Sequence, residues 1–185
     1  MPELEFHRAP REPRFLEDYR TLAVEIGAPE LVATFAHGAV LLGVGLTGDL
    51  PERPRSSRRR TLRAEEIAEL RRVASVEERV WRLKKSPGAA RGGYITLGQS
   101  ADNDLVVPEY TVSTRHCAFG HDGFRYTVID LMSLNGTRVD GRLVTPGEPT
   151  PLRDGVAIEL GRLSLRVLYG ESFVRRIARG HVSAA

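Results

Sequence analysis

The second half of the chain is a run of short strand-like segments separated by tight turns, and this pattern constrains the fold more than any other feature. The segments are VWRL (80–83), YITL (94–97), DLVV (104–107), HCAF (116–119), FRYTVIDL (124–131), TRV (137–139), VAIEL (156–160) and LSLRVLY (163–169). The intervening turns contain Asp122-Gly123, Asn135-Gly136, Asp140-Gly141, Pro146-Gly147 and Asp154-Gly155. Many short strands with turns this close together predict a mainly β fold, an antiparallel sandwich or barrel.

The first fifty residues have a different pattern. Apolar residues over 14–26 recur at helical spacing, and Gly27 and Pro29 mark the end of that helix and the start of another. The uncharged stretch between Glu30 and Asp49 is slightly short for a membrane-spanning helix and contains four glycines. We therefore predict a second helix to about residue 37, a buried strand over AVLLGVGL (39–46), and no membrane partner.

Composition suggests a division of the chain into five parts. Residues 51–60, PERPRSSRRR, contain no apolar residue and read as a linker. The predicted parts are a helical or mixed N-terminal region (1–50), an arginine-rich linker (51–61), a helix (62–77), the β domain (78–170) and a C-terminal helix or tail (171–185). In the third part, Leu62, Ile67, Leu70 and Val73 face one way on a helix over about 62–74. We expect residues 78–170 to fold alone, because their strands and turns are mutually consistent.

Charge and cysteine content narrow the classes of function. The net charge is +3, yet residues 86–170 carry eight basic and nine acidic side chains. A nucleic-acid binder usually has a basic face on its folded domain, so we expect no nucleic-acid partner. Cys117 is the one cysteine, which excludes an intrachain disulfide and fits a reducing compartment. Because the first residues also lack a secretory signal pattern, we predict a cytoplasmic protein.

Four separated motifs follow one another in the β region. They are ITLGQS (95–100) with NDLVV (103–107), VSTRHC (112–117), DLMSLNGTRV (130–139) and LRDGVAIELG (152–161). Each motif is weak alone, but together, in this order and in an all-β context, they resemble the forkhead-associated (FHA) domain over about half the chain. The resemblance implies an FHA-type β-sandwich, with a small helical N-terminal region, that binds phosphothreonine peptides. It implies a signalling adaptor with no enzymatic activity, no cofactor and no metal.

The resemblance also assigns roles to individual residues. Ser113 corresponds to the family's phosphate-binding serine, and Thr114 to a further donor beside it. Asn135 corresponds to the asparagine that holds the main chain of the ligand, a task that suits an amide because it both donates and accepts. Residues expected to support the site are Gly98, His116, Gly136 and Thr137. A phosphorylated protein is the expected partner, and a Ser/Thr kinase and a second copy of this chain are further candidates.

Two positions depart from the family pattern. The family's phosphate-binding arginine falls on Gln99, which is neutral and cannot form the charged fork that holds a phosphate through two hydrogen bonds. Leu134 stands where a small hydroxyl residue is often found. Arg115 and Arg91 are the nearest basic residues in sequence that could compensate. A weak or degenerate phosphate pocket follows, and a phosphate-independent interaction or oligomerisation module is the alternative.

Catalytic alternatives have less support. Ser113 with His116 could form a nucleophile and a base, but no acid is marked as the orienting third member, so a loop brace is favoured. Cys117 adjoins His116 on a strand, where neighbours face opposite ways, and is predicted to be a core residue. Gly43–Gly48 lacks the lysine of a phosphate-binding loop. An enzyme or effector function of residues 1–74 is a remaining alternative, although no paired carboxylates, metal ligands or nucleophile–base pair is recognisable there.

Overall fold

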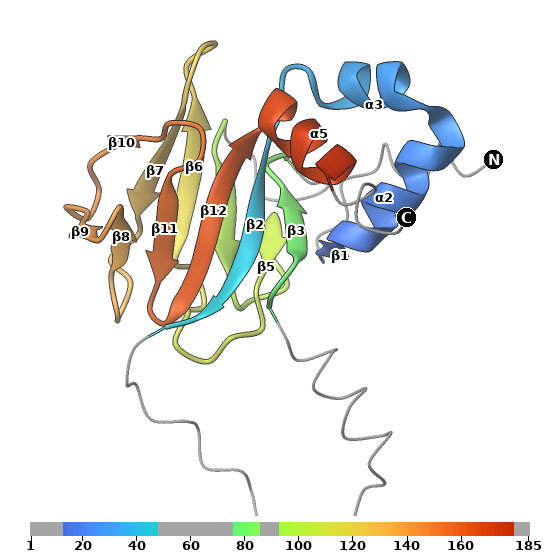
Figure 1. Ribbon diagram of the computed structural model, residues 1–185. Helices are drawn as coiled ribbons and strands as arrows, with labels where there is room; N and C mark the ends of the chain where they lie inside the picture. The colour runs from blue at the N-terminus through green and yellow to red at the C-terminus, as the bar shows by residue number, and fades with distance from the viewer. Residues whose placement is uncertain (1–12, 48–75, 86–92, 180–185) are drawn as a thin grey trace, which may run out of the picture.

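The computed structural model describes residues 13–47, 76–85 and 93–179, which form two β-sheets and a layer of helices (Figure 1). The seven-stranded sheet has the order β1 (Arg14–Phe15), β3 (Arg79–Arg82), β2 (Ala39–Leu46), β12 (Leu163–Tyr169), β11 (Ala157–Leu160), β8 (Thr137–Val139) and β9 (Arg142–Leu143). The five-stranded sheet has the order β10 (Thr150–Pro151), β7 (Tyr126–Asp130), β6 (Cys117–His121), β4 (Ile95–Gly98) and β5 (Leu105–Val106). Only the β4–β5 pair is parallel among these ladders. The predicted antiparallel sandwich is therefore confirmed.

The core of the sandwich lies between the two sheets. Leu97, Phe119 and Val128 enter it from the smaller sheet, and Ile158 and Leu165 enter it from the larger one; each is fully buried. This arrangement follows from the period-two alternation of the strands, which places every second side chain on the inner face. Cys117 is also fully buried in this core, as predicted. Its burial raises the pKa of the thiol, so the residue remains an inert core group.

Trp81 of β3 ties the two sheets together. Its side chain is buried in the sandwich core, and its indole Nε1 donates a hydrogen bond to the carbonyl oxygen of Val106 at 3.1 Å. A buried indole needs such an acceptor, because an unpaired N–H in an apolar core costs free energy. β3 thereby reaches across the sandwich to β5 at the edge of the opposite sheet.

The strand β2 belongs to the sandwich, which differs from the predicted boundary at residue 78. β2 lies between β3 and β12, with seven residue pairs to β12 and three to β3. Leu41 faces the sandwich core, whereas Val40 and Leu42 face the helices. A strand covered on both faces needs apolar side chains on both, and this accounts for the nearly continuous apolar run of AVLLGVGL. Strand prediction was correct here, but the partners of the strand come from far along the chain.

Three helices cover the outer face of the larger sheet: α2 (Leu16–Ile26), α3 (Ala28–Phe35) and α5 (Gly170–Arg179) (Figure 1). They enclose a second apolar cluster with the outward-facing residues of the sheet. Tyr19, Phe35 and Phe173 form its centre, with ring centroids 4.9–5.8 Å apart in edge-to-face geometry. Leu168 of β12 points away from the sandwich core and is buried in this cluster.

The secondary structure follows the sequence pattern closely where both can be compared. The helices predicted at 14–26 and from Pro29 are α2 and α3, and each strand-like segment of the β region contains a strand. The two-residue strands β1, β9 and β10 were not predicted. The predicted linker at 51–61 and nearly all of the predicted helix at 62–77 lie outside the described residues. Within the described residues, no helix is long and apolar enough to cross a membrane.

Candidate functional site

Three loops converge at one end of the sandwich and contain every residue that was predicted to contact a ligand. They are the β4–β5 loop (99–104), the β5–β6 loop (107–116) and the β7–β8 loop (131–136). Backbone hydrogen bonds hold the first two together, from Gln99 N to Ser113 O and from Ser100 N to Thr114 O, both 3.1 Å. Binding groups placed on loops over a rigid sandwich are a common design, because the strands hold the loop ends in place.

Gln99 is exposed, but its side chain is turned toward the β5–β6 loop. Its amide Nε2 donates a 2.7 Å hydrogen bond to the carbonyl oxygen of Glu109. The side chain of Gln99 therefore holds two loops together. A neutral amide can do this, and it leaves the position without the positive charge that a phosphate would require.

Ser113 and Leu134 join the β5–β6 loop to the β7–β8 loop. The hydroxyl Oγ of Ser113 accepts a 3.0 Å hydrogen bond from the backbone N–H of Leu134. A hydroxyl has one donor hydrogen and two acceptor lone pairs, so this bond leaves the O–H of Ser113 able to donate elsewhere. The apolar side chain of Leu134 is 89% exposed beside it.

Asn135 makes a second connection between the same two loops. Its Nδ2 donates a 2.7 Å hydrogen bond to the carbonyl oxygen of Thr111. Gly136 follows with φ of +76°, a left-handed conformation that suits glycine. The exposed amide of Asn135 is thus held at the tip of the β7–β8 loop, next to Ser113.

A buried charged network, which was not predicted from the sequence, lies beneath these loops. Glu109 is 6% exposed, and its carboxylate accepts hydrogen bonds from the backbone N–H and the hydroxyl of Thr111. The other carboxylate oxygen accepts a 2.9 Å bond from Arg162 Nε, and the backbone N–H of Arg162 donates to the Thr111 hydroxyl at 3.1 Å. Arg162 lies 53 residues from Glu109, so no local pattern could have linked them. The network fixes the loop that carries Ser113 to the β11–β12 turn.

A second missed residue, Asn103, supports the loops from the other side. Its Nδ2 donates 2.8 Å hydrogen bonds to the carbonyl oxygens of Ser100 and Thr114, and its side chain is 1% exposed. Gly98 permits this close packing, because a Cβ at that position would meet Thr114 O at 2.3 Å. The polar Asn103 directly before a strand was a signal in the sequence, but the resemblance assigned it no role.

His116 braces the loops from beneath. Its Nδ1 accepts a 3.0 Å hydrogen bond from the backbone N–H of Ser113, and its Nε2 lies 3.2 Å from the carbonyl oxygen of Gly136. Since Nδ1 accepts, the proton is on Nε2 and donates to Gly136 O. The ring is fully buried, and this burial lowers the pKa of His116. Both nitrogens of the neutral ring are used in loop contacts, which argues against a catalytic base.

A pH dependence of stability follows from His116. Below about pH 6.5, the ordinary value for imidazole, the unfolded chain binds a proton that the folded chain resists. Stability should therefore fall as the pH drops from 7.5 to 5.5, with a slope contribution of up to about 1.4 kcal/mol per pH unit. Urea unfolding across this range measures the slope. His116→Gln can keep one donor and one acceptor without titrating, so it should flatten the profile. An equal slope in the variant would contradict the assignment.

Asp130 anchors the β7–β8 loop at its base. Its carboxylate accepts hydrogen bonds from the Ser133 backbone N–H at 2.9 Å, the Ser133 hydroxyl at 2.6 Å and the Thr137 hydroxyl at 2.6 Å. Burial alone would raise the pKa of Asp130, but the hydrogen bonds outweigh it and the pKa is lowered. Thr137 is fully buried in this contact. The loop between Asp130 and Thr137 is therefore held at both ends.

The remaining predicted residues lie on the surface of the loop cluster. Thr114 and Arg115 are exposed, so both side chains are accessible to a ligand. Arg91 lies outside the described residues. Among those described, no group of three or more His, Cys, Asp or Glu side chains could hold a metal ion. The loops thus present hydroxyl, amide and guanidinium groups around one end of the sandwich.

Comparison with known proteins agrees with this architecture. The model of the FHA domain family matches residues 95–161, which span the three loops and the strands that hold them. Residues 95–161 are an FHA domain. The match begins at β4 and ends after β11, so β2, β3 and β12 lie outside it although they complete the sheets.

The relatives of this chain include bacterial regulators. An oxoglutarate dehydrogenase inhibitor of Corynebacterium jeikeium is 37% identical over 73 residues, which are 40% of this chain and 49% of the relative. The glycogen accumulation regulator GarA of Mycolicibacterium smegmatis is 34% identical over 75 residues, which are 40% of this chain and 46% of GarA. The chain therefore spans about half the length of these relatives.

Solved FHA structures are also similar to this chain. The FhaA FHA domain is 30% identical, with a TM-score of 0.40, over 49% of this chain and 88% of that one. A structure from a study of phosphothreonine-dependent FHA domain interactions is 22% identical, with a TM-score of 0.44, over 71% of this chain and 95% of that one.

Proposed function

We propose that this FHA protein is a cytoplasmic signalling adaptor that binds a phosphothreonine segment of a partner protein weakly at the three-loop site. The observation that carries the proposal is the convergence of Ser113, Thr114 and Asn135 on adjoining loops. Hydrogen bonds from the Leu134 backbone and to Thr111 hold two of these side chains in place. Pre-positioned hydroxyl and amide groups suit a phosphate and the peptide beside it, because little ordering is needed on binding.

The charge at the site supports weak rather than tight binding. Gln99 is neutral and bonded to Glu109 O, so it supplies no cation to a phosphate. Arg115 is exposed on the loop that carries Ser113, and it makes no hydrogen bond or ion pair with the described part of the chain. It is the cation we assign to the phosphate. Binding, rather than catalysis, is the function proposed, and no cofactor is required for it.

Exposed apolar side chains at the same end of the sandwich favour a second function. Three apolar side chains there are exposed to solvent: Met132 (85%), Leu134 (89%) and Leu143 (61%). The side chain of Leu143 lies close to Gly136. Exposed apolar side chains gathered on neighbouring loops are typical of protein interaction surfaces. A phosphate-independent partner, or a second copy of this chain, would use these side chains in place of Ser113 and Arg115.

Binding to a degenerate phosphothreonine peptide library, with unphosphorylated peptides as the reference, tests the proposal. We expect selection of phosphorylated peptides, and at least ten-fold weaker binding after Asn135→Ala or Arg115→Ala, because each removes a ligand contact of about 1.4 kcal/mol or more. Arg125→Ala is the matched control, since Arg125 is exposed in the β6–β7 turn at the other end of β6.

Salt and phosphate dependence separate the two functions. Charge contacts with a phosphate are screened, so phosphopeptide binding should weaken as salt increases. Equal binding of phosphorylated and unphosphorylated peptides, lost on Leu134→Ser but not on Arg115→Ala, would replace the phosphopeptide proposal with the phosphate-independent one.

A further inference from the structure

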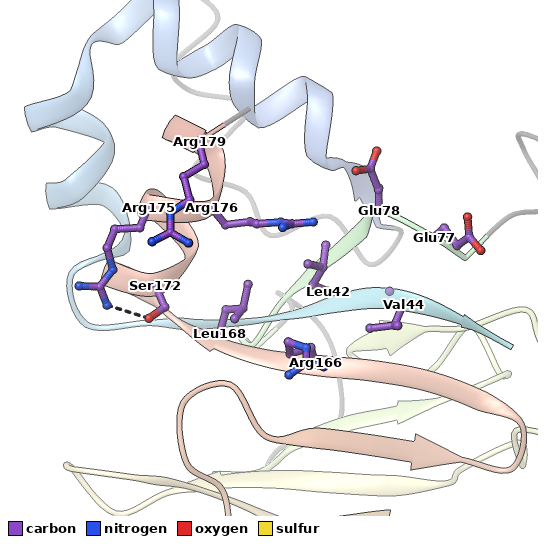
Figure 2. Close-up of a pocket in the computed structure, with 11 residues that line it drawn as sticks. Leu42, Val44, Glu77, Glu78, Arg166, Leu168, Ser172, Arg175, Arg176 and Arg179 are labelled. Atoms are coloured by element: carbon purple, nitrogen blue, oxygen red, sulfur yellow. Dashed lines mark hydrogen bonds between the residues drawn. The ribbon is translucent and has the colours of Figure 1, made fainter. Parts of the chain in front are cut away.

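A groove with a volume of about 720 Å³ lies on the outer face of the larger sheet, and none of its lining residues belongs to the three-loop site (Figure 2). Its floor is apolar and is formed by Leu42 and Val44 of β2 and Leu168 of β12. In Figure 2, Leu42 and Leu168 point from the sheet into the groove. Val44 is 46% exposed, so the described residues leave part of this floor open. A recessed apolar surface of this kind is typical of a binding site.

Four exposed arginines border the apolar floor, and they come from two elements. Arg175, Arg176 and Arg179 belong to α5, and Arg166 belongs to β12. Arg166 lies in the middle of the floor, because it pairs with Leu42 in the ladder between β12 and β2. In Figure 2, Arg176 extends from α5 across the floor. Positive charge is therefore present both along one wall of the groove and within its floor.

Two of these arginines are partly satisfied by the protein itself. Arg175 donates a 3.0 Å hydrogen bond to Ser172 Oγ and has Glu171 as an anionic neighbour at 3.8 Å. Arg166 donates a 2.9 Å hydrogen bond to the carbonyl oxygen of Gly155, which neutralises none of its charge. Within the described residues, Glu171 is the only carboxylate that pairs with any of the four arginines.

The other two arginines have no partner in the part of the chain that the structure describes. Arg176 and Arg179 make no hydrogen bond or ion pair there. They are three residues apart on α5, and Arg175 and Arg179 are four apart, so like charges face one another along the helix. Such pairs destabilise a helix, although the helix dipole favours cations in the last turn and offsets part of the repulsion. Carboxylates of a ligand would relieve this repulsion.

The charges on the opposite side of the groove narrow the class of ligand. Glu77 and Glu78 line that side, so the four arginines face two acidic residues across the floor. A membrane surface or a nucleic acid presents uniform negative charge, which the two glutamates would repel. A protein segment can carry carboxylates at one end and an apolar or basic side chain at the other. The planar guanidinium group also suits carboxylates, because it can donate two parallel hydrogen bonds to them.

We propose that this groove binds an acidic segment of a partner protein. Asp or Glu side chains of the segment bind Arg176 and Arg179, and an apolar side chain beside them packs on the floor of the groove. A further carboxylate can reach Arg166, because its guanidinium lies in the floor between the two walls. The groove is separate from the three-loop site, so this binding needs no phosphothreonine, and the chain can hold a second partner at the same time.

Selection from a library of random, unphosphorylated peptides on the immobilised full chain tests the proposal. We expect enrichment of peptides in which Asp or Glu residues adjoin an apolar residue. Arg176→Glu with Arg179→Glu should weaken binding of the selected peptides about ten-fold, because it replaces two attractions by two repulsions. Arg138→Glu with Arg142→Glu is the matched control, since these arginines are exposed on β8 and β9 and the change in charge is the same. Equal binding by the two double variants would overturn the proposal.

Two further variants place the selected peptides on the molecule. Val44→Asp puts a carboxylate into the half-exposed floor and should weaken binding about ten-fold, with an unchanged circular dichroism spectrum as the check on folding. Arg115→Ala at the three-loop site should leave binding unchanged, and loss of binding there would overturn the assignment to the groove. Vesicles containing phosphatidylserine provide the last comparison. Binding of vesicles without enrichment of any peptide, abolished by Arg176→Glu with Arg179→Glu, would assign the groove to a membrane surface and overturn the proposal.

Discussion

Gln99→Arg is expected to tighten binding of a phosphothreonine peptide about ten- to a hundred-fold. Residue 99 is exposed, and its backbone N–H donates a hydrogen bond to the carbonyl oxygen of Ser113. The backbone of an arginine at this position would therefore lie beside the proposed phosphate site. A charge-assisted hydrogen bond contributes about 1.5–3 kcal/mol, and about 1.4 kcal/mol is a factor of ten in affinity. The bond from the Gln99 amide to Glu109 O is lost in the variant, which offsets part of the gain. Calorimetry with matched phosphorylated and unphosphorylated peptides at fixed salt measures the effect.

Gln99→Met is the control for this substitution, because it keeps the length of the side chain and adds no charge. It should leave phosphopeptide affinity unchanged or slightly lower. If Gln99→Arg also leaves affinity unchanged, Arg115 alone supplies all the positive charge that the phosphate needs, and Arg115→Ala should then abolish binding. Absence of peptide binding by every variant would contradict the phosphopeptide proposal itself.

A fragment of residues 78–170 is expected not to fold, although the sequence pattern favoured an independent unit there. Without β2, the strands β3 and β12 lose the neighbour that lies between them. Burial of Val40, Leu41 and Leu42 is also lost, at about 1.5–3 kcal/mol for each side chain. This loss is comparable to the whole stability of a typical domain, about 5–15 kcal/mol.

A series of fragments separates the contribution of β2 from that of the helices. The fragment 78–170 should lack a cooperative thermal transition in circular dichroism. The fragment 38–170 restores the sheet but exposes Val40, Leu42 and Leu168, so it should fold with reduced stability. The fragment 13–179 should unfold cooperatively like the full chain. A cooperative transition for 78–170, with a β-rich spectrum, would show that β2 is dispensable.

Much of the loop cluster could be predicted from the sequence, because its residues lie in short motifs. The motifs around Ser113, His116 and Asn135 placed these residues on neighbouring loops, and the structure brings them together. The resemblance implied that His116 supports the site, and in the structure its ring nitrogens lie within hydrogen-bonding distance of Ser113 N and Gly136 O. The roles of Ser113, Thr114 and Asn135 in ligand binding stay predictions until peptide binding is measured.

The supporting contacts of the site could not be predicted in the same way. Whether Gln99 projects toward a ligand or bonds to Glu109 O depends on the distance between two loops. The ion pair of Glu109 with Arg162 joins residues 53 positions apart, and its partial burial arises only when the β11–β12 turn packs on the β5–β6 loop. Such contacts have no local signature, because they result from the packing of separate elements.

By itself, the sequence determined the longer strands, the turns, the first two helices and the order of the loop motifs. These features depend on period-two or helical alternation and on glycine-containing turns, which are local properties of the chain. Only the tertiary structure decided that β2 completes the sandwich, that Leu168 is covered by helices, and that a charged groove lies beside β2. Strand pairing and the covering of a sheet face join residues far apart along the chain, for example Leu46 with Leu163, and no local pattern specifies which partner is chosen.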